Sequence, residues 1–168
     1  MMFAKIIMHR KIIHFMAMTT FEIGGIRQFD PLDIDEVMEI CSSSLSESYS
    51  KSVVYEIFLS WHEGFYVFAN GKQIIGFLAG SRKTQHDARV LLLATREKYR
   101  NLGIGQELMK KFEEKCRYLG LLSVRLEVRT DNELGIKFYK RLGYSITSSL
   151  PSYYSDGSDA YVMWKPLF

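Results

Sequence analysis

The chain has 168 residues, of which 47% are hydrophobic and 24% are charged, as expected for one globular domain with a core of its own. Its formal net charge of +3 at pH 7 is too small to indicate direct binding of nucleic acid, and no basic block is interleaved with aromatic residues. No apolar run reaches the roughly 20 residues of a membrane-spanning helix, so we expect no membrane partner.

The first twenty residues are interpreted as an N-terminal extension of uncertain role, and residues 21–168 as a single domain. The extension is rich in Met and Ile, but basic residues and histidines interrupt every stretch that could form the apolar centre of a secretory signal. The two cysteines, Cys41 and Cys116, have no histidine at metal-ligand spacing. We therefore expect buried thiols, no metal site and a reducing compartment, the cytoplasm.

The first part of the domain predicts a strand, two helices and a hairpin. A short strand over 23–27 is followed by Asp30-Pro31, a helix start in which Asp30 caps. Apolar residues then recur at helical spacing. The two predicted helices, separated by a serine-rich loop, and the two hairpin strands cover 34–42, 53–61, 65–69 and 73–81. Between the hairpin strands lies Asn70-Gly71, a dipeptide typical of the type I′ turn.

The second part predicts four strands alternating with two helices. An apolar run over 90–95 indicates a strand covered on both faces. A helix with one apolar stripe follows and ends at Gly120. Next come an alternating strand over 122–129, with Leu122 on its apolar face, and a helix from Asp131 or Asn132 to Gly143. Its predicted buried row is Leu134, Phe138 and Leu142, and strands over 144–149 and 160–165 close a mixed α/β fold.

A glycine-rich loop over 100–105 lies between the predicted strand ending near Thr95 and the amphipathic helix. Gly103 and Gly105 lack Cβ atoms, so the backbone can present free N–H groups to an anion at the helix N-terminus, and a diphosphate suits such a site. The glycine spacing excludes a Walker loop, and Leu108 replaces the third glycine of a dinucleotide fingerprint. The alternative is a glycine-rich turn that binds nothing.

Taken together, these features resemble the GNAT superfamily of acetyl-coenzyme A-dependent acetyltransferases, whose diphosphate loop has the pattern Arg/Gln-x-x-Gly-x-Gly/Ala. Residues 100–105 match it, and residues 126–132, 138–139 and 142–144 resemble the later part of protein N-terminal acetyltransferases. Residues 153–163 are similar to the Tyr-Tyr-x-Asp-Gly-x-Asp-Ala-Tyr-x-Met signature of the NatA catalytic subunit and its archaeal relatives.

Residues 45–49 are similar to the Leu-Pro-Glu-Asn-Tyr loop of the same subfamily, with Ser46 and Ser48 as departures. The resemblance therefore covers about residues 26–167. It implies a GNAT fold, a mixed and mostly antiparallel sheet of about seven strands flanked by about four helices. It also implies acetyl transfer from acetyl-coenzyme A to the α-amino group of a protein or nascent peptide, by direct attack in a ternary complex. An auxiliary subunit or the ribosome is a possible further partner.

The resemblance assigns the cofactor to the glycine loop, to the backbone of the preceding strand and to the helix that follows the next strand. The expected cofactor-binding residues are Leu93, Ala94, Thr95, Arg100, Asn101, Leu102, Gly103, Ile104, Gly105, Gln106, Asn132 and Tyr139. Asn132 and Tyr139 lie about two helical turns apart, so both side chains can reach the same side of one helix. The resemblance makes Tyr139 the general acid; the alternative is a core tyrosine with a satisfied hydroxyl.

Two glutamates, Glu127 and Glu47, are candidates for the general base, and the sequence does not choose between them. For Glu127 the alternative is a cross-strand ion pair with Arg125 or Arg129, and for Glu47 it is an exposed loop carboxylate. Some relatives have a histidine at the position of Arg89, so a histidine–water relay is excluded here.

A weak base suffices for an α-amino group, whose pKa of ~7.7 to 8.0 makes deprotonation easier than that of lysine by roughly 3 kcal/mol. The resemblance further predicts that Glu47, Tyr49, Tyr153 and Tyr154 form the peptide groove; the alternative is a surface aromatic cluster. Two other functions remain open at this stage: acetylation of lysine or of small-molecule amines, and a non-catalytic coenzyme A-binding module.

Overall fold

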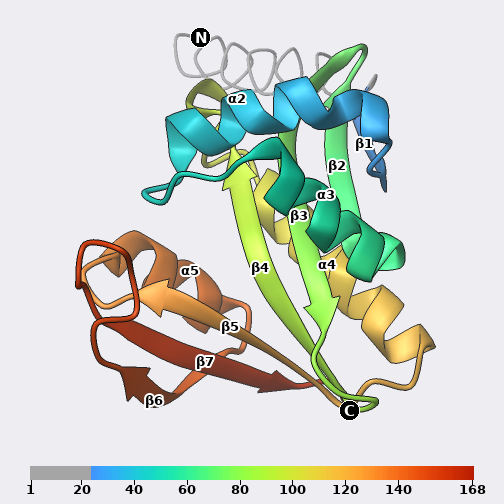
Figure 1. Cartoon of the computed structure of the whole chain (residues 1–168). Coiled ribbons are helices and arrows are strands. Elements are labelled where there is room, and N and C mark those ends of the chain that lie inside the picture. Colours follow the sequence, from blue (N-terminus) through green and yellow to red (C-terminus); the bar gives the residue numbers. More distant parts are fainter. Residues whose placement is uncertain (1–23) are drawn as a thin grey trace, which may run out of the picture.

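The computed structural model describes residues 24–168 as a seven-stranded sheet with helices on both faces (Figure 1). The strands are β1 (Gly24–Gln28), β2 (Phe65–Asn70), β3 (Gln73–Arg82), β4 (Asp87–Thr95), β5 (Ser123–Arg129), β6 (Ser145–Leu150) and β7 (Ala160–Pro166). The α-helices are α2 (Ile34–Ser44), α3 (Lys51–Ser60), α4 (Ile104–Tyr118) and α5 (Glu133–Arg141). The predicted mixed α/β fold is therefore confirmed.

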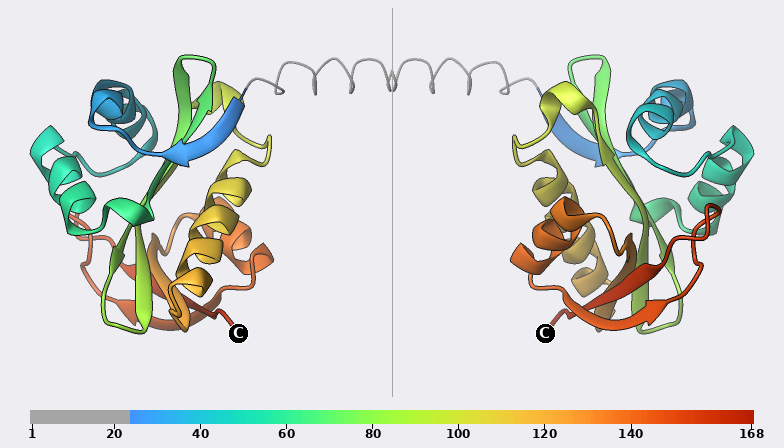
Figure 2. Two further views of the ribbon diagram at one scale, coloured as in Figure 1. Left: turned by 90° about the vertical axis from the view of Figure 1, so that its right-hand side faces the viewer. Right: turned by 90° about the vertical axis from the view of Figure 1, so that its left-hand side faces the viewer.

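The strands lie in the order β1-β2-β3-β4-β5-β7-β6, and only the β4–β5 pair is parallel. A parallel connection needs a crossover, which α4 provides. Helices α2 and α3 cover one face of the sheet and α4 covers the other (Figure 2). No helix within residues 24–168 is both long and apolar enough to cross a membrane.

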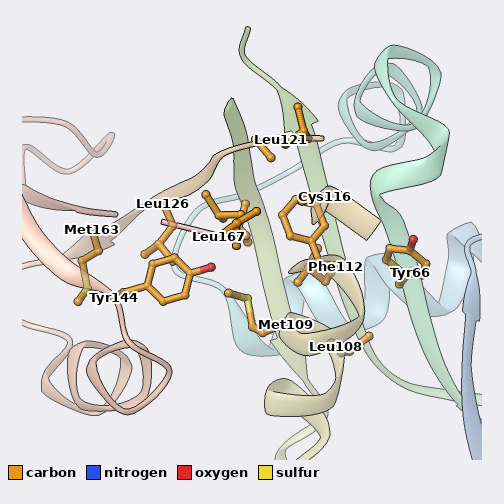
Figure 3. Close-up of a cluster of buried hydrophobic side chains, with 14 of the residues drawn as sticks. Tyr66, Leu108, Met109, Phe112, Cys116, Leu121, Leu126, Tyr144, Met163 and Leu167 are labelled. Carbon is orange, nitrogen blue, oxygen red and sulfur yellow. The ribbon is translucent and has the colours of Figure 1, made fainter. Parts of the chain in front are cut away.

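Two buried clusters hold the sheet to its helices. One joins α2 and α3 to β2, β3 and β4, and includes Cys41. The other joins α4 to both halves of the sheet: Met109, Phe112 and Cys116 share it with Leu126 and Tyr144 of the second half (Figure 3). Both thiols are buried, as predicted, and burial raises the pKa of Cys41 to about 11 and that of Cys116 to about 12.

A β-bulge interrupts the pairing of β3 with β4. Gly80 pairs with Val90 and Ala79 pairs with Leu92, so Leu91 is the extra residue. The bulge reverses the alternation of the strand. The even-numbered side chains of β4 therefore join the α4 cluster before Leu91 and the α2–α3 cluster after it.

Three local predictions were wrong. Leu134 is 80% exposed because residues 131–134, at the start of α5, all lie at the surface, and Ile136 and Tyr139 pack on the core instead. Leu122 is 53% exposed, because β5 begins one residue later. The hairpin turn is not type I′ on Asn70-Gly71: Asn70 pairs with Gln73, and of the two turn residues between them only Gly71 has positive φ, as in type II′.

The element boundaries also moved. Strand β4 begins three residues before the apolar run that predicted it, because polar Asp87 and Arg89 alternate with its first apolar residues. Asp30 caps a short 3-10 turn ahead of α2, with Pro31 as its first residue. Ile23, the predicted first residue of the first strand, lies outside the described residues.

We predict that Gly80→Ala destabilises the fold by about 1–3 kcal/mol, because overpacking a filled core has that cost. A Cβ at this position would lie 2.3 Å from the ring of Phe112, which is fully buried. Chemical denaturation monitored by circular dichroism measures the change. The matched control is Gly25→Ala, also in a strand, where a Cβ meets nothing within 4 Å and stability should be nearly unchanged. Equal stability of the two variants would contradict the assigned packing.

Candidate active site

A cavity of about 580 Å³ lies where β4 and β5 separate. Its wall combines residues of β4, β5 and α5, the last residue of α2, Ile57 of α3 and two loops, one after α2 and one between β6 and β7. The lining residues are Ser44, Leu45, Ser46, Glu47, Tyr49, Ile57, Arg89, Val90, Leu91, Leu92, Leu93, Leu126, Glu127, Val128, Arg129, Asn132, Gly135, Phe138, Tyr139, Tyr153 and Tyr154. The volume suits a small ligand or the reactive end of a larger one.

The parallel ladder between β4 and β5 is short. It pairs residues 87–90 with residues 123–126 and ends at Val90 and Leu126 (Figure 1). Beyond this point β4 continues to Thr95 with no strand beside it on that edge within the described chain. Its backbone can therefore pair with an extended ligand, as an added strand would.

The glycine loop forms an anion site at the start of α4. Gly103 has φ of +85°, a conformation that glycine adopts without strain, and no side chain caps the helix. The first N–H bonded within the helix is that of Glu107, 3.0 Å from the Gly103 carbonyl oxygen. The N–H groups of the first three helical residues therefore remain available, and the helix dipole favours an anion beside them.

The glycine loop lies next to the cavity and does not line it. Arg100 Nη2 donates to Ser44 Oγ at 3.2 Å, and Ser44 is part of the cavity wall. On the other side, a Cβ on Gly105 would lie 3.4 Å from the ring of Phe138, another lining residue. The resemblance assigns two of these regions, the glycine loop and the free edge of β4, to the cofactor. Both therefore lie next to the same cavity.

Glu127 lies between two arginines at the closed end of the split. Arg89 Nε donates to Oε2 at 2.7 Å, and Arg125 Nη2 donates to Oε1 at 2.5 Å. The Glu127 side chain is only 5% exposed. An ion pair is therefore present, as in the alternative for Glu127, but its geometry differs: Arg125 lies on the same strand, and the cross-strand partner is Arg89, which the sequence did not indicate.

Glu47 and the cavity tyrosines come from two loops that meet. The Ser155 N–H donates to Glu47 Oε1 at 3.3 Å, which joins the loop after α2 to the loop between β6 and β7. The rings of Tyr153 and Tyr154 contact edge to face, with centroids 5.1 Å apart. Burial raises the pKa of the Tyr154 hydroxyl to about 12, and burial also raises the pKa of Tyr49.

Arg129 fixes the β6–β7 loop onto β5. Its Nη2 donates to Asp156 at 2.7 Å and to the Ser158 hydroxyl at 2.6 Å, and its guanidinium lies over the Tyr154 ring. This guanidinium also holds the pKa of Asp156 below its ordinary value. Gly157, with φ of +82°, makes the sharp turn inside the loop. Asp156 and Gly157 therefore fix the shape of the loop that carries the two tyrosines.

Helix α5 supplies Asn132 and Tyr139 to the same cavity. Asn132 is the N-cap, and its side-chain oxygen accepts from the Gly135 N–H at 2.9 Å. A Cβ on Gly135 would lie 2.7 Å from the Asn132 side chain, so glycine makes room for this capping conformation. Tyr139 has no hydrogen-bond partner among the described side chains, and burial raises the pKa of its hydroxyl well above the ordinary value.

The cavity brings together Leu93, Asn132 and Tyr139 with all four predicted substrate residues and Glu127. It excludes Ala94, Thr95 and residues 100–106, which lie along its margin. The lining role of Ser44, Arg89 and Phe138 was not predicted from the sequence. Arg89 had a signal, because some relatives have a histidine at its position, and so did Phe138, which belongs to the resembling pair 138–139.

Comparison with known proteins supports this description. Residues 34–144 match the sequence profile of the Acetyltransferase (GNAT) family. An uncharacterised N-acetyltransferase of Methanocaldococcus jannaschii is 34% identical over 146 residues, which cover 83% of this chain and 90% of that protein. N-alpha-acetyltransferase 30 of Schizosaccharomyces pombe is 29% identical over 132 residues, which cover 76% of this chain and 88% of that protein.

A solved structure agrees in both sequence and shape. Ard1 from Thermoplasma volcanium is 44% identical, superposes with a TM-score of 0.85, and is matched over 87% of this chain and 99% of its own. The profile covers most of the domain, including the glycine loop, β5 and α5. The chain therefore belongs to the GNAT family of acetyltransferases.

Proposed function

We propose that the protein transfers the acetyl group of acetyl-coenzyme A to the α-amino group of protein N-termini. The observation that carries this proposal is the joining of two loops over the cavity, through Glu47 and the Ser155 N–H. Together the loops place a carboxylate and three tyrosines, Tyr49, Tyr153 and Tyr154, beside the split in the sheet. Relatives that bear the name N-alpha-acetyltransferase support it.

The residues present fit acetyl-coenzyme A. The free N–H groups after Gly103, with Arg100 beside them, suit a diphosphate, and the free edge of β4 suits an extended amide-bearing arm. When bound, this cofactor supplies an activated acetyl thioester. Of the predicted cofactor residues Leu93, Ala94 and Thr95, Leu93 lines the cavity, so its backbone N–H is the candidate donor to the thioester carbonyl.

Tyr139 is the proposed proton donor. Because burial disfavours the phenolate, its hydroxyl stays protonated throughout the neutral pH range. With acetyl-coenzyme A bound, the amine nitrogen would bond to the carbonyl carbon as the C–S bond breaks. Tyr139 would donate its proton to the departing sulfur and would regain a proton, through water, from the nitrogen that becomes the amide.

We propose that Glu47, and not Glu127, contacts the substrate amine. Each carboxylate oxygen of Glu127 accepts from an arginine, so its charge is already balanced within the sheet. Glu47 accepts only from a backbone N–H among the described residues, and it lines the cavity. Its charge is therefore available to attract an α-ammonium group and, through water, to accept a proton from it.

The compartment and further partners are also proposals. Two buried cysteines without a disulfide suit a reducing compartment, and we propose the cytoplasm. An auxiliary subunit or the ribosome would bring nascent chains to the cavity; co-purification with ribosomes from the native source tests this.

The central experiment measures the release of free thiol from acetyl-coenzyme A. We expect turnover with tetrapeptides that begin with Ser or Ala and none with the same peptides carrying a blocked N-terminus. Variation of the first two residues then defines the preference. Turnover of a lysine side chain or a polyamine, with the free peptides inert, would establish the rival acetyltransferase activity. Binding of acetyl-coenzyme A without turnover of any amine would establish a non-catalytic module.

We predict that Gly103→Ala weakens acetyl-coenzyme A binding about tenfold in calorimetry. Its φ of +85° costs an alanine roughly 1–2 kcal/mol, which shifts the loop away from the conformation that presents its N–H groups. Gly71→Ala is the matched control: it has φ of +61° and open space around it, but lies in the β2–β3 hairpin. An unchanged Kd for Gly103→Ala would argue against the anion site.

We predict that Glu47→Gln lowers kcat/KM for peptides by about 10²-fold while the melting temperature stays near that of the parent, since acid–base groups contribute about 10²–10⁴-fold. Glu127→Gln should instead lower the melting temperature, because it leaves two partly buried arginines without a counter-charge. In the same assay Tyr139→Phe should lower kcat. The reverse pattern for the two glutamates would assign the base to Glu127.

A further inference from the structure

Arg89 links the sheet to the substrate loop through a single side chain. Its Nε donates to Glu127 at 2.7 Å and its Nη2 donates to the Tyr153 hydroxyl at 2.6 Å. Arg89 lies in β4, whereas Tyr153 lies 64 residues later, in the loop between β6 and β7. All three residues line the cavity.

The position of Arg89 is fixed by charge. It pairs across the parallel ladder with Arg125, and like charges placed directly opposite one another are destabilising. The Glu127 carboxylate accepts from both arginines and removes this repulsion. Because the ladder still holds at this point and ends one residue later, at Val90, the guanidinium is attached to a rigid part of the sheet.

This contact restricts what Tyr153 can do. A guanidinium has donors and no acceptor, so the phenolic oxygen accepts from Arg89 and its own proton is left for another acceptor. Without Arg89 the hydroxyl could turn to donate or to accept. With it, Tyr153 is oriented as a hydrogen-bond donor at the cavity wall.

We propose that Arg89 is a positioning residue that orients the Tyr153 hydroxyl to donate to a backbone carbonyl oxygen of the peptide substrate. This inference rests on the proposed function. Peptide carbonyls are the acceptors that every N-terminus carries, whatever its first side chain. Arg89 therefore contributes to peptide binding in general and does not select the first residue.

The test is a double-mutant cycle on Arg89 and Tyr153, measured with Ser- and Ala-starting peptides. We expect Arg89→Gln and Tyr153→Phe each to raise the peptide KM about tenfold, as loss of a charge-assisted hydrogen bond does, with the KM for acetyl-coenzyme A unchanged. The double variant should be no worse than either single variant, because both remove the same interaction. The factor should be equal for both peptides.

Two further variants separate positioning from stability. Arg89→Lys keeps the positive charge beside Glu127 but lacks the second donor group that reaches Tyr153, so the fold should survive and the peptide KM should still rise. Arg125→Gln removes the other arginine from Glu127, so the melting temperature should fall while the peptide KM stays the same.

Additive effects in the cycle, or a peptide KM unaltered in Arg89→Lys, would overturn the inference. Failure of the proposed function looks different, because the parent protein would then turn over neither peptide. Circular dichroism of each variant confirms that the kinetic comparison is made on folded protein.

Discussion

The parallel pairing of β4 with β5 ends after Val90 and Leu126, and the site depends on this limit. Had the two strands paired along their full length, the cavity would be filled by a continuous sheet. Because they separate, β4 keeps an unpaired edge, β5 and α5 turn their side chains toward the opening, and α4 begins with its N–H groups next to it. The bulge at Leu91 lies one residue beyond the last pair, and bulges increase local twist. The strand irregularity and the opening therefore occur at the same place.

Opening a sheet exposes polar and charged groups, and this protein balances them in pairs. Arg89 and Arg125 share Glu127, and Arg129 is held by Asp156. After these pairs are made, Glu47 is the cavity-lining carboxylate that no cation of the described chain neutralises. This charge balance supports the proposal that Glu47 binds a cationic amine. The available negative charge results from which charged groups are paired. It does not result from the overall composition, because the chain has nearly equal numbers of basic and acidic residues.

Much of the fold could be predicted because its signals are local. The spacing of apolar residues gave the helices, the Asp30-Pro31 pair gave a cap, and Gly103 marked the start of α4. The predictions that were wrong depended on contacts between residues far apart in the sequence or on the backbone dihedral angles of a turn. Leu134 fits the periodicity of α5 but falls in an exposed first turn, and no pattern shows where a core ends.

The same holds for the site. A resemblance in sequence brought Tyr139, Asn132 and the two tyrosines of the β6–β7 loop to attention, and the structure gathers them around one cavity. The contact between Glu47 and Ser155 spans 108 residues, and that between Arg89 and Tyr153 spans 64. Neither follows from spacing along the chain, because each depends on how the two halves of the sheet are held together.

Helix α4 holds those halves. Its buried face packs on β2 and β3, and it shares one buried cluster with Leu126, Tyr144 and Met163 of the second half, so the cluster bridges the gap that the strands leave open (Figure 3). We therefore expect the two halves of the divided sheet to unfold together. A ligand bound in the gap would contact both halves of the sheet, and its binding energy would add to the free energy of unfolding through mass action.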